Sequence, residues 1–143
     1  MILVQKILFL KNVPLFSSMP PSDLSHLAKI AEEIIYQTGE TIITQGEHGE
    51  RLYLIVHGTV SVLQNGSPVA TLSDTHFFGE MSILDGEPRS ASVKATSDCL
   101  LLSISKDDFY TILSRYPEVS LHIIRTLTQR LRQTNQTEPS KQE

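Results

Sequence analysis

Glycines divide the middle of this chain into short apolar segments. All seven glycines of the 143 residues lie there, and the segments between them are rich in β-branched and aromatic residues. Glycine adopts the left-handed conformations of tight turns without steric cost, whereas β-branched and aromatic residues favour strands. The pattern therefore predicts a mainly β fold, an antiparallel roll or jelly-roll barrel over residues 34–105. The glycines are Gly39, Gly46, Gly49, Gly58, Gly66, Gly79 and Gly86.

Two turn signals refine this expectation. Residues 52–56 and 59–63 are strand-like and bracket His57 and Gly58, so they predict a β-hairpin. The Asn-Gly pair at 65–66 predicts the next turn. Structural turns of the roll, rather than ligand contacts, are expected at Gly39, Gly46 and Gly58.

Helical periodicity flanks the roll on both sides. Ser22 and Asp23 are good helix caps and predict a helix that ends near Glu33. After the roll, residues 106–115 predict one helix, and Pro117 suits the first turn of a last helix. The inward positions expected on these two helices are Phe109, Ile112, Leu113, Val119, Leu121, Ile124, Leu127 and Leu131. The predicted domain spans 1–136, with helices at 1–33 and 106–136 and a disordered tail at 137–143.

Composition argues against several classes of protein. A net charge of −4 provides no basic footprint for duplex DNA, so direct DNA binding is not expected. Residues 1–10 are apolar but too short and too interrupted by Lys6 to span a bilayer, and they predict an amphipathic helix packed on the domain. The single cysteine, Cys99, cannot form an internal disulfide and is expected to be a buried thiol, which fits a cytoplasmic location.

The residues best suited to bind a ligand lie in one segment, 78–93. Gly79 permits a sharp turn, and residues 80–84 can form a short helical turn whose first amides bind an anion. Arg89 adds a planar fork of donors that matches two phosphate oxygens. Glu80 can accept a hydrogen bond from a sugar hydroxyl. One phosphate charge beside one ribose hydroxyl describes a cyclic nucleotide, since a non-cyclised nucleotide would bring surplus negative charge toward Glu80.

This segment closely resembles the phosphate-binding cassette of cyclic nucleotide-binding domains. Protein kinase A regulatory subunits, cyclic nucleotide-gated channels and bacterial catabolite activator proteins carry such a cassette, and the resemblance extends over about residues 8–136. It implies that Glu80 binds the ribose 2′-hydroxyl and Arg89 the cyclic phosphate, while amides near Ser82 and Ser90 complete the phosphate cradle. The ligand-binding positions that it implies are Phe78, Gly79, Glu80, Met81, Ser82, Arg89, Ser90 and Ala91.

The last helix resembles the helix that follows the roll in catabolite activator proteins, where it covers the base and pairs two subunits. The resemblance places Thr134 and Asn135 at base-contacting positions and Arg130 near Glu80. A solvated helical face is the alternative for these residues and for Arg125 and Arg132. Two partners remain open, a homodimer through the apolar side of this helix or an effector domain in a longer parent protein. The helix-turn-helix domain of that family has no room after residue 136.

Other functions fit the residues less well. A surface ion pair of Glu80 with Arg89 would explain neither Gly79 nor the apolar residues between the two charges. The five histidines are scattered along the chain, so neither a metal site, nor another cofactor, nor an enzyme is expected. A degenerate fold that binds a protein partner and no ligand is the main alternative.

The sequence thus predicts a non-enzymatic regulatory domain whose ligand is cAMP, or else cGMP. Family members that favour cGMP often carry Thr after the cassette arginine, where Ser90 stands in this chain. Ligand contacts through Arg89 are expected to close the last helix over the base, and this closure is the allosteric signal. The expected location is the cytoplasm, or the cytoplasmic part of a membrane protein.

Overall fold

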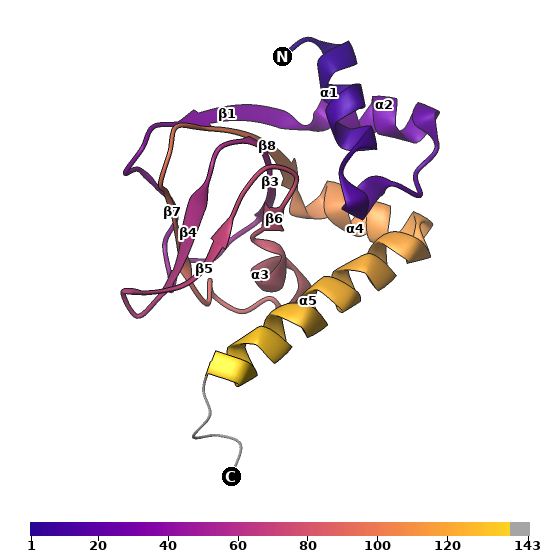
Figure 1. Cartoon of the computed structure of the whole chain (residues 1–143). Coiled ribbons are helices and arrows are strands. Elements are labelled where there is room, and N and C mark those ends of the chain that lie inside the picture. Colours follow the sequence, from indigo (N-terminus) through magenta and orange to yellow (C-terminus); the bar gives the residue numbers. More distant parts are fainter. Residues whose placement is uncertain (138–143) are drawn as a thin grey trace.

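The structure is a computed structural model that describes residues 1–137, and the side chains of 134–137 are outside the description. Figure 1 shows a roll of strands, with α1 and α2 packed at one corner and α5 running diagonally past it. The predicted tail, 137–143, falls outside the described residues except for Thr137, with which α5 ends. The helices are α1 (Leu3–Lys11), η1 (Pro14–Phe16), α2 (Pro21–Ile30), α3 (Glu80–Asp85), α4 (Lys106–Arg115) and α5 (Pro117–Thr137).

Two four-stranded antiparallel sheets form the roll, and the predicted fold class is confirmed. The first sheet has the order β1-β8-β3-β6, and the second has the order β2-β7-β4-β5. Leu54 lies opposite Leu102 in the first, and Val62 lies opposite Val93 in the second. The strands are β1 (Glu32–Tyr36), β2 (Thr41–Ile43), β3 (Arg51–His57), β4 (Val60–Gln64), β5 (Ser67–Leu72), β6 (Phe77–Phe78), β7 (Ser92–Ala95) and β8 (Cys99–Ser105).

The predicted hairpin around Gly58 is wrong, because β3 and β4 belong to different sheets. Gly58 has φ +116° and carries the chain from one sheet to the other. A Cβ on it would lie 2.7 Å from the carbonyl oxygen of Asp98 and 2.7 Å from Sγ of Cys99. Position 58 therefore needs glycine for two reasons: its backbone is at positive φ, and it lies too close to the start of β8 to leave room for a side chain. The next turn is a hairpin as expected, with Asn65 and Gly66 both at positive φ between β4 and β5.

The N-terminal helices differ from the prediction at their ends. Ser22 and Asp23 do not cap α2, because that helix begins at Pro21 and both residues lie in its first turn. Proline has its φ preset for the first helical position, so Pro21 starts the helix without a side-chain cap. The helix ends at Ile30 and β1 begins at Glu32, so the roll starts two residues before the predicted boundary.

A single core cluster joins the roll to the helices. Phe16 of η1 and Phe109 of α4 are fully buried in it, together with Leu102 of β8. Burying an aromatic or aliphatic side chain of this size contributes about 1.5–3 kcal/mol. Cys99 is buried, as predicted, in a second cluster inside the roll. The first half of α5 packs on the first of these clusters through Val119 and Ile123.

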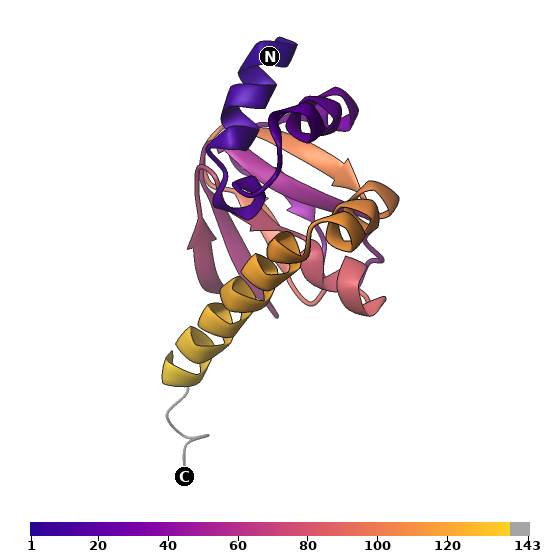
Figure 2. The ribbon, with the colours of Figure 1, turned by 90° about the vertical axis from the view of Figure 1, so that its right-hand side faces the viewer.

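The inward face predicted for α5 is right at Val119 and Leu127 and wrong at its other three positions. Val119 and Ile123 are buried and Leu127 packs beside them, whereas the other predicted inward residues are exposed. The exposed fractions are 44% for Leu121, 59% for Ile124 and 61% for Leu131. At 3.6 residues per turn, positions 119, 123, 127 and 130 share one face, and 121, 124 and 131 share the opposite side. Figure 2 shows the end of α5 extending beyond the roll.

Candidate functional site

A pocket lies between the roll, α3 and α5. It has a volume of about 90 Å³, and all eight residues predicted for the ligand site line it. Arg130 of α5 lines it as well. Its remaining walls are apolar side chains from the four strands of the second sheet, namely Ile43, Val62, Leu72 and Val93. The pocket therefore combines two cations and one carboxylate with an apolar floor.

Gly79 makes the turn that starts α3. Its φ is +94°, a conformation that other residues adopt only with strain. A Cβ on it would lie 2.9 Å from the carbonyl oxygen of Arg51 and 2.9 Å from Nη1 of Arg89. Gly79 is thus required both for the turn, as predicted, and for the room that Arg89 occupies.

The guanidinium of Arg89 is buried, with 8% of the residue exposed. Its Nη1 donates to the carbonyl of Gly79 at 2.6 Å, and its Nη2 donates to the carbonyl of Arg51 at 3.0 Å. Burial lowers the pKa of Arg89, while Tyr53 and Glu80 act to raise it. An arginine nevertheless stays protonated in proteins. The two bonds use two of five N–H donors, so the group is held in place with donors left for a ligand.

Glu80, the first residue of α3, is 2% exposed. Its Oε1 accepts a hydrogen bond from Nη1 of Arg130 at 2.8 Å. Burial raises the pKa of Glu80 because it disfavours the charged carboxylate, and Arg130 and Arg89 offset part of this effect. The carboxylate is therefore a buried acceptor that takes up a proton more readily than an exposed glutamate.

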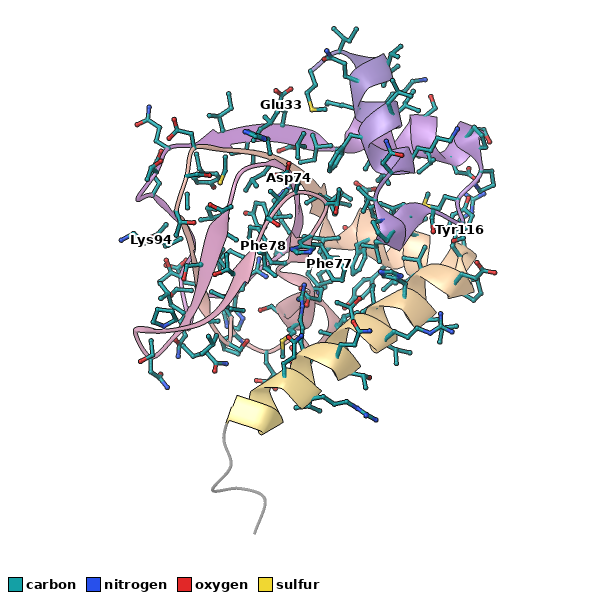
Figure 3. All side chains as sticks on the ribbon, viewed as in Figure 1. Glu33, Asp74, Phe77, Phe78, Lys94 and Tyr116 are labelled. Carbon is teal, nitrogen blue, oxygen red and sulfur yellow. The ribbon has the colours of Figure 1, made fainter. Side chains whose placement is uncertain are left out.

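Arg130 connects α5 to this site. Besides its bond to Glu80, its Nη2 donates to the carbonyl of Phe77 at 2.9 Å, and its guanidinium lies 5.1 Å from the centroid of the Phe77 ring. Figure 3 labels Phe77 and Phe78 within the roll, above α5 in this view. The predicted proximity of Arg130 to Glu80 is confirmed, and a solvated face is wrong for Arg130 but right for Arg125 and Arg132, which are exposed. The side chains of Thr134 and Asn135 lie outside the described residues.

The sequence reasoning missed three contributors to the site. Arg51 contributes through its carbonyl, which every residue type provides, so no sequence signal could have identified it. Phe77 directly precedes the cassette, and its aromatic ring is a signal that could have been used. Gly49 lies against the guanidinium of Arg89, where a Cβ would be 1.8 Å from Nε. The sequence alone does not separate Gly49 from the turn glycines, because only the structure shows that its φ is not positive.

Ser82 and Ser90 occupy different environments. Ser82 is buried in α3, whereas Ser90 is exposed at the rim of the pocket. The hydroxyl of Ser90 donates to Sδ of Met81 at 3.9 Å, a weak bond across the pocket mouth. Among the described residues, no group of three or more His, Cys, Asp or Glu side chains could hold a metal ion.

A roll of two antiparallel sheets that buries an arginine and a glutamate beneath a C-terminal helix defines a class of nucleotide-sensing domain. The chain belongs to the cyclic nucleotide-binding domain family, whose model matches residues 33–116. Two curated relatives illustrate the breadth of the family. The human potassium/sodium hyperpolarization-activated cyclic nucleotide-gated channel 2 is 38% identical over 74% of this chain and 12% of the channel. The cAMP-dependent protein kinase regulatory subunit of Aspergillus niger is 34% identical over 78% of this chain and 28% of that subunit.

Solved structures agree with this assignment. The catabolite activator protein of Thermus thermophilus is 30% identical with a TM-score of 0.77, over 90% of this chain and 63% of that chain. The regulatory subunit of a cAMP-independent protein kinase A from Trypanosoma cruzi, bound to guanosine, is 27% identical with a TM-score of 0.77. That match covers 83% of this chain and 43% of that one. Within the described residues, no helix has the length and apolar character needed to cross a membrane.

Proposed function

We propose that this domain is a non-catalytic sensor that binds a cyclic nucleotide, cAMP in preference to cGMP, between the roll and α5. The observation that carries the proposal is the pairing of a buried guanidinium, Arg89, with a buried carboxylate, Glu80, in one pocket with apolar walls. A ligand with one phosphate charge, one hydroxyl donor and a flat apolar base suits these three features.

Each predicted residue has a distinct role in this proposal. Arg89 binds the cyclic phosphate with the donors that Gly79 and Arg51 leave unused, and the backbone amides near Ser82 and Ser90 complete the cradle. Glu80 accepts from the ribose 2′-hydroxyl through Oε2, since Oε1 accepts from Arg130. Phe78, Gly79, Met81 and Ala91 shape the surrounding wall.

The lid role falls to α5. Arg130, Thr134 and Asn135 lie along one stretch of this helix, and we assign them to the base that the cradle leaves exposed. A ligand that binds the closed arrangement more tightly than the open one shifts α5 toward closure. The preference for cAMP over cGMP rests on Ser90, which stands where cGMP-binding relatives often carry threonine.

Two outputs fit this mechanism. Leu121, Ile124 and Leu131 form an exposed apolar side of α5 that could pair two copies of the chain. Alternatively, the domain regulates an effector within a longer protein, since it spans only a small part of the curated relatives that it matches. In that case it would lie in the cytoplasm or form the cytoplasmic part of a membrane protein. Light scattering distinguishes the two, because a dimer has twice the 16.0 kDa mass and Ile124→Lys should return it to a monomer.

The ligand class is tested by calorimetric titration of protein that has been unfolded and refolded to remove carried-over ligand. Four ligands are titrated separately, namely cAMP, cGMP, AMP and guanosine. Binding of cAMP with AMP and guanosine much weaker supports a cyclic nucleotide sensor. Tighter binding of guanosine, as in the trypanosome structure, would move the proposal to a nucleoside. No heat from any of these ligands, in folded protein, would favour a protein-interaction module.

The phosphate role of Arg89 is tested by Arg89→Ala. Loss of charge-assisted hydrogen bonds to the phosphate should weaken cAMP binding on the order of 100-fold while the fold survives. Arg132→Ala is the matched control, because Arg132 is exposed on α5. An unchanged affinity in Arg89→Ala would show that the phosphate site lies elsewhere.

A further inference from the structure

Gly49 differs from the other glycines of the chain. Six of the seven have positive φ and lie at turns that need it, but Gly49 does not. Gly49 therefore does not depend on the left-handed conformation that favours glycine at the other six positions. Another constraint must account for a glycine at this position, and the structure provides one in the side chain of Arg89.

The guanidinium of Arg89 occupies the space where a side chain at position 49 would stand. A Cβ on Gly49 would lie 1.8 Å from Nε, 1.9 Å from Cζ and 2.3 Å from Nη2 of Arg89. Such distances are far below any van der Waals contact, so one of the two groups has to move. The atoms in conflict belong to the end of a flexible side chain, so the guanidinium rather than the backbone is the group that we expect to move.

The remaining walls of this place are backbone groups. The carbonyls of Gly79 and Arg51 accept from Nη1 and Nη2 of Arg89. The loop that contains Gly49 is itself tied to the arginine, because the amide of Arg89 donates to the carbonyl of Glu47 at 2.7 Å and the amide of Gly46 donates to the carbonyl of Arg89 at 2.9 Å. We call this enclosure, made by Gly49, Gly79 and the carbonyl of Arg51, the arginine seat.

We propose that Gly49 is a positioning residue of the ligand site, which by lacking a side chain keeps the arginine seat open and so directs the free N–H donors of Arg89 at the phosphate. The inference rests on the proposed function for its ligand, but the seat itself is a property of the protein alone. Any residue larger than glycine at position 49 should leave the fold in place and move the guanidinium away from the pocket.

The experiment combines Gly49→Ala with a double-mutant cycle. Affinity for cAMP is measured by calorimetry in wild type, Gly49→Ala, Arg89→Ala and the double variant, with thermal unfolding to show that each is folded. His48→Ala is the matched control, because His48 is the exposed neighbour of Gly49 in the same loop and its replacement adds no side chain at the seat. A ¹H–¹⁵N spectrum of the arginine Nε–H groups gives a readout without nucleotide, and the Arg89 signal is identified by its loss in Arg89→Ala.

Gly49→Ala is expected to weaken cAMP binding roughly 10- to 100-fold, the scale of charge-assisted hydrogen bonds lost from the phosphate. It should add nothing in the Arg89→Ala background, where no guanidinium fills the seat. The Nε–H signal of Arg89 should shift or broaden in Gly49→Ala and stay unchanged in His48→Ala.

Wild-type affinity in Gly49→Ala, or an equal loss with and without Arg89, would overturn the proposal. If the wild-type protein binds no nucleotide at all, the proposed function fails. The Nε–H signal of Arg89 then tests the arginine seat without a ligand. A displaced signal in Gly49→Ala then supports the seat, and an unchanged signal overturns it.

Discussion

The guanidinium of Arg130, on the last helix, lies 2.8 Å from the carboxylate of Glu80 at the start of α3. Fifty positions separate the two residues, and the pair joins the last helix to the residue that we propose to bind the ribose. The carboxylate is almost fully buried, whereas a third of the Arg130 side chain is exposed. The pair therefore links α5 directly to a buried residue that lines the pocket.

Arg130→Gln should loosen α5 from the roll. The substitution leaves a buried carboxylate without its cation, which costs about 1–3 kcal/mol before solvent reaches it. Hydrogen exchange should quicken in the second half of α5 while the strands stay protected. Arg132→Gln is the matched control, and equal exchange in the two variants would contradict a role for the Arg130 pair.

Glu80 should give ligand binding a pH dependence. Burial holds its pKa above the ordinary glutamate value, and the ionised form is the better acceptor for a ribose hydroxyl. Affinity for cAMP should therefore rise with pH across the interval from the ordinary value to the raised one. Titrations from about pH 4.5 to 8 should show this rise in wild type and a flat profile in Glu80→Gln, which we expect to bind about 3- to 10-fold more weakly. A rise that persists in the variant would assign the dependence to another group.

Glu80 should make the protein less stable to unfolding as pH rises, although the same rise in pH should strengthen ligand binding. The folded protein holds the Glu80 proton more tightly than the unfolded chain, because its pKa is raised. The contribution of this group is fully present below the ordinary glutamate pKa and is lost as pH rises through the raised value. Urea unfolding at several pH values, compared with Glu80→Gln, should show this loss in wild type and not in the variant.

Tyr110 should connect α4 to the pocket. Its hydroxyl donates to the carbonyl of Ile83 in α3. The ammonium of Lys106 lies 5.7 Å from the centroid of its ring. Tyr110→Phe keeps the ring and removes the hydroxyl, so it should cost about 0.5–1.5 kcal/mol and speed hydrogen exchange in α3. Ser114→Ala, whose hydroxyl bonds within α4, is the control. No change in α3 would show that the two helices move independently.

Asp23 should raise the pKa at which Tyr116 titrates. The hydroxyl of Tyr116 donates to the carboxylate of Asp23, and this hydrogen bond raises the pKa of the tyrosine. Figure 3 labels Tyr116 where α5 begins, near the N-terminal helices. Ultraviolet titration should lose one high-pKa tyrosine component in Tyr116→Phe, and in Asp23→Asn that component should return toward the ordinary value. An unchanged titration in Asp23→Asn would contradict the pairing.

The part of the candidate site whose residues lie close together in the sequence could be predicted from the sequence. The eight predicted residues fall within a segment of fourteen positions, and their spacing already defines a turn, a helix start and a following arginine. The contacts of Arg89 with Gly49 and Arg51 cross about forty positions, and no local pattern carries that information. Arg130 shares its helix face with Val119 and Ile123, so helical periodicity alone could have placed it toward the core.

The fold was predictable in class but not in strand pairing. Glycine spacing indicates short strands and turns, and the Asn65-Gly66 hairpin follows from its own two residues. The segment at Gly58 has the same appearance, yet its chain crosses between sheets because the start of β8 packs against it. Similarly, the apolar residues of α5 fall on two sides, and only the packed neighbours decide which side is buried.

Arg130 stands in the wall of the pocket and at the same time fastens α5 across it. If the proposed site is correct, a nucleotide can enter or leave only while that ion pair is open. The association rate of the nucleotide would then depend on how often α5 moves away from the pocket. Its residence time would depend on how long α5 remains closed over it. Substitutions on α5 would change the duration of the signal even where the equilibrium affinity is preserved.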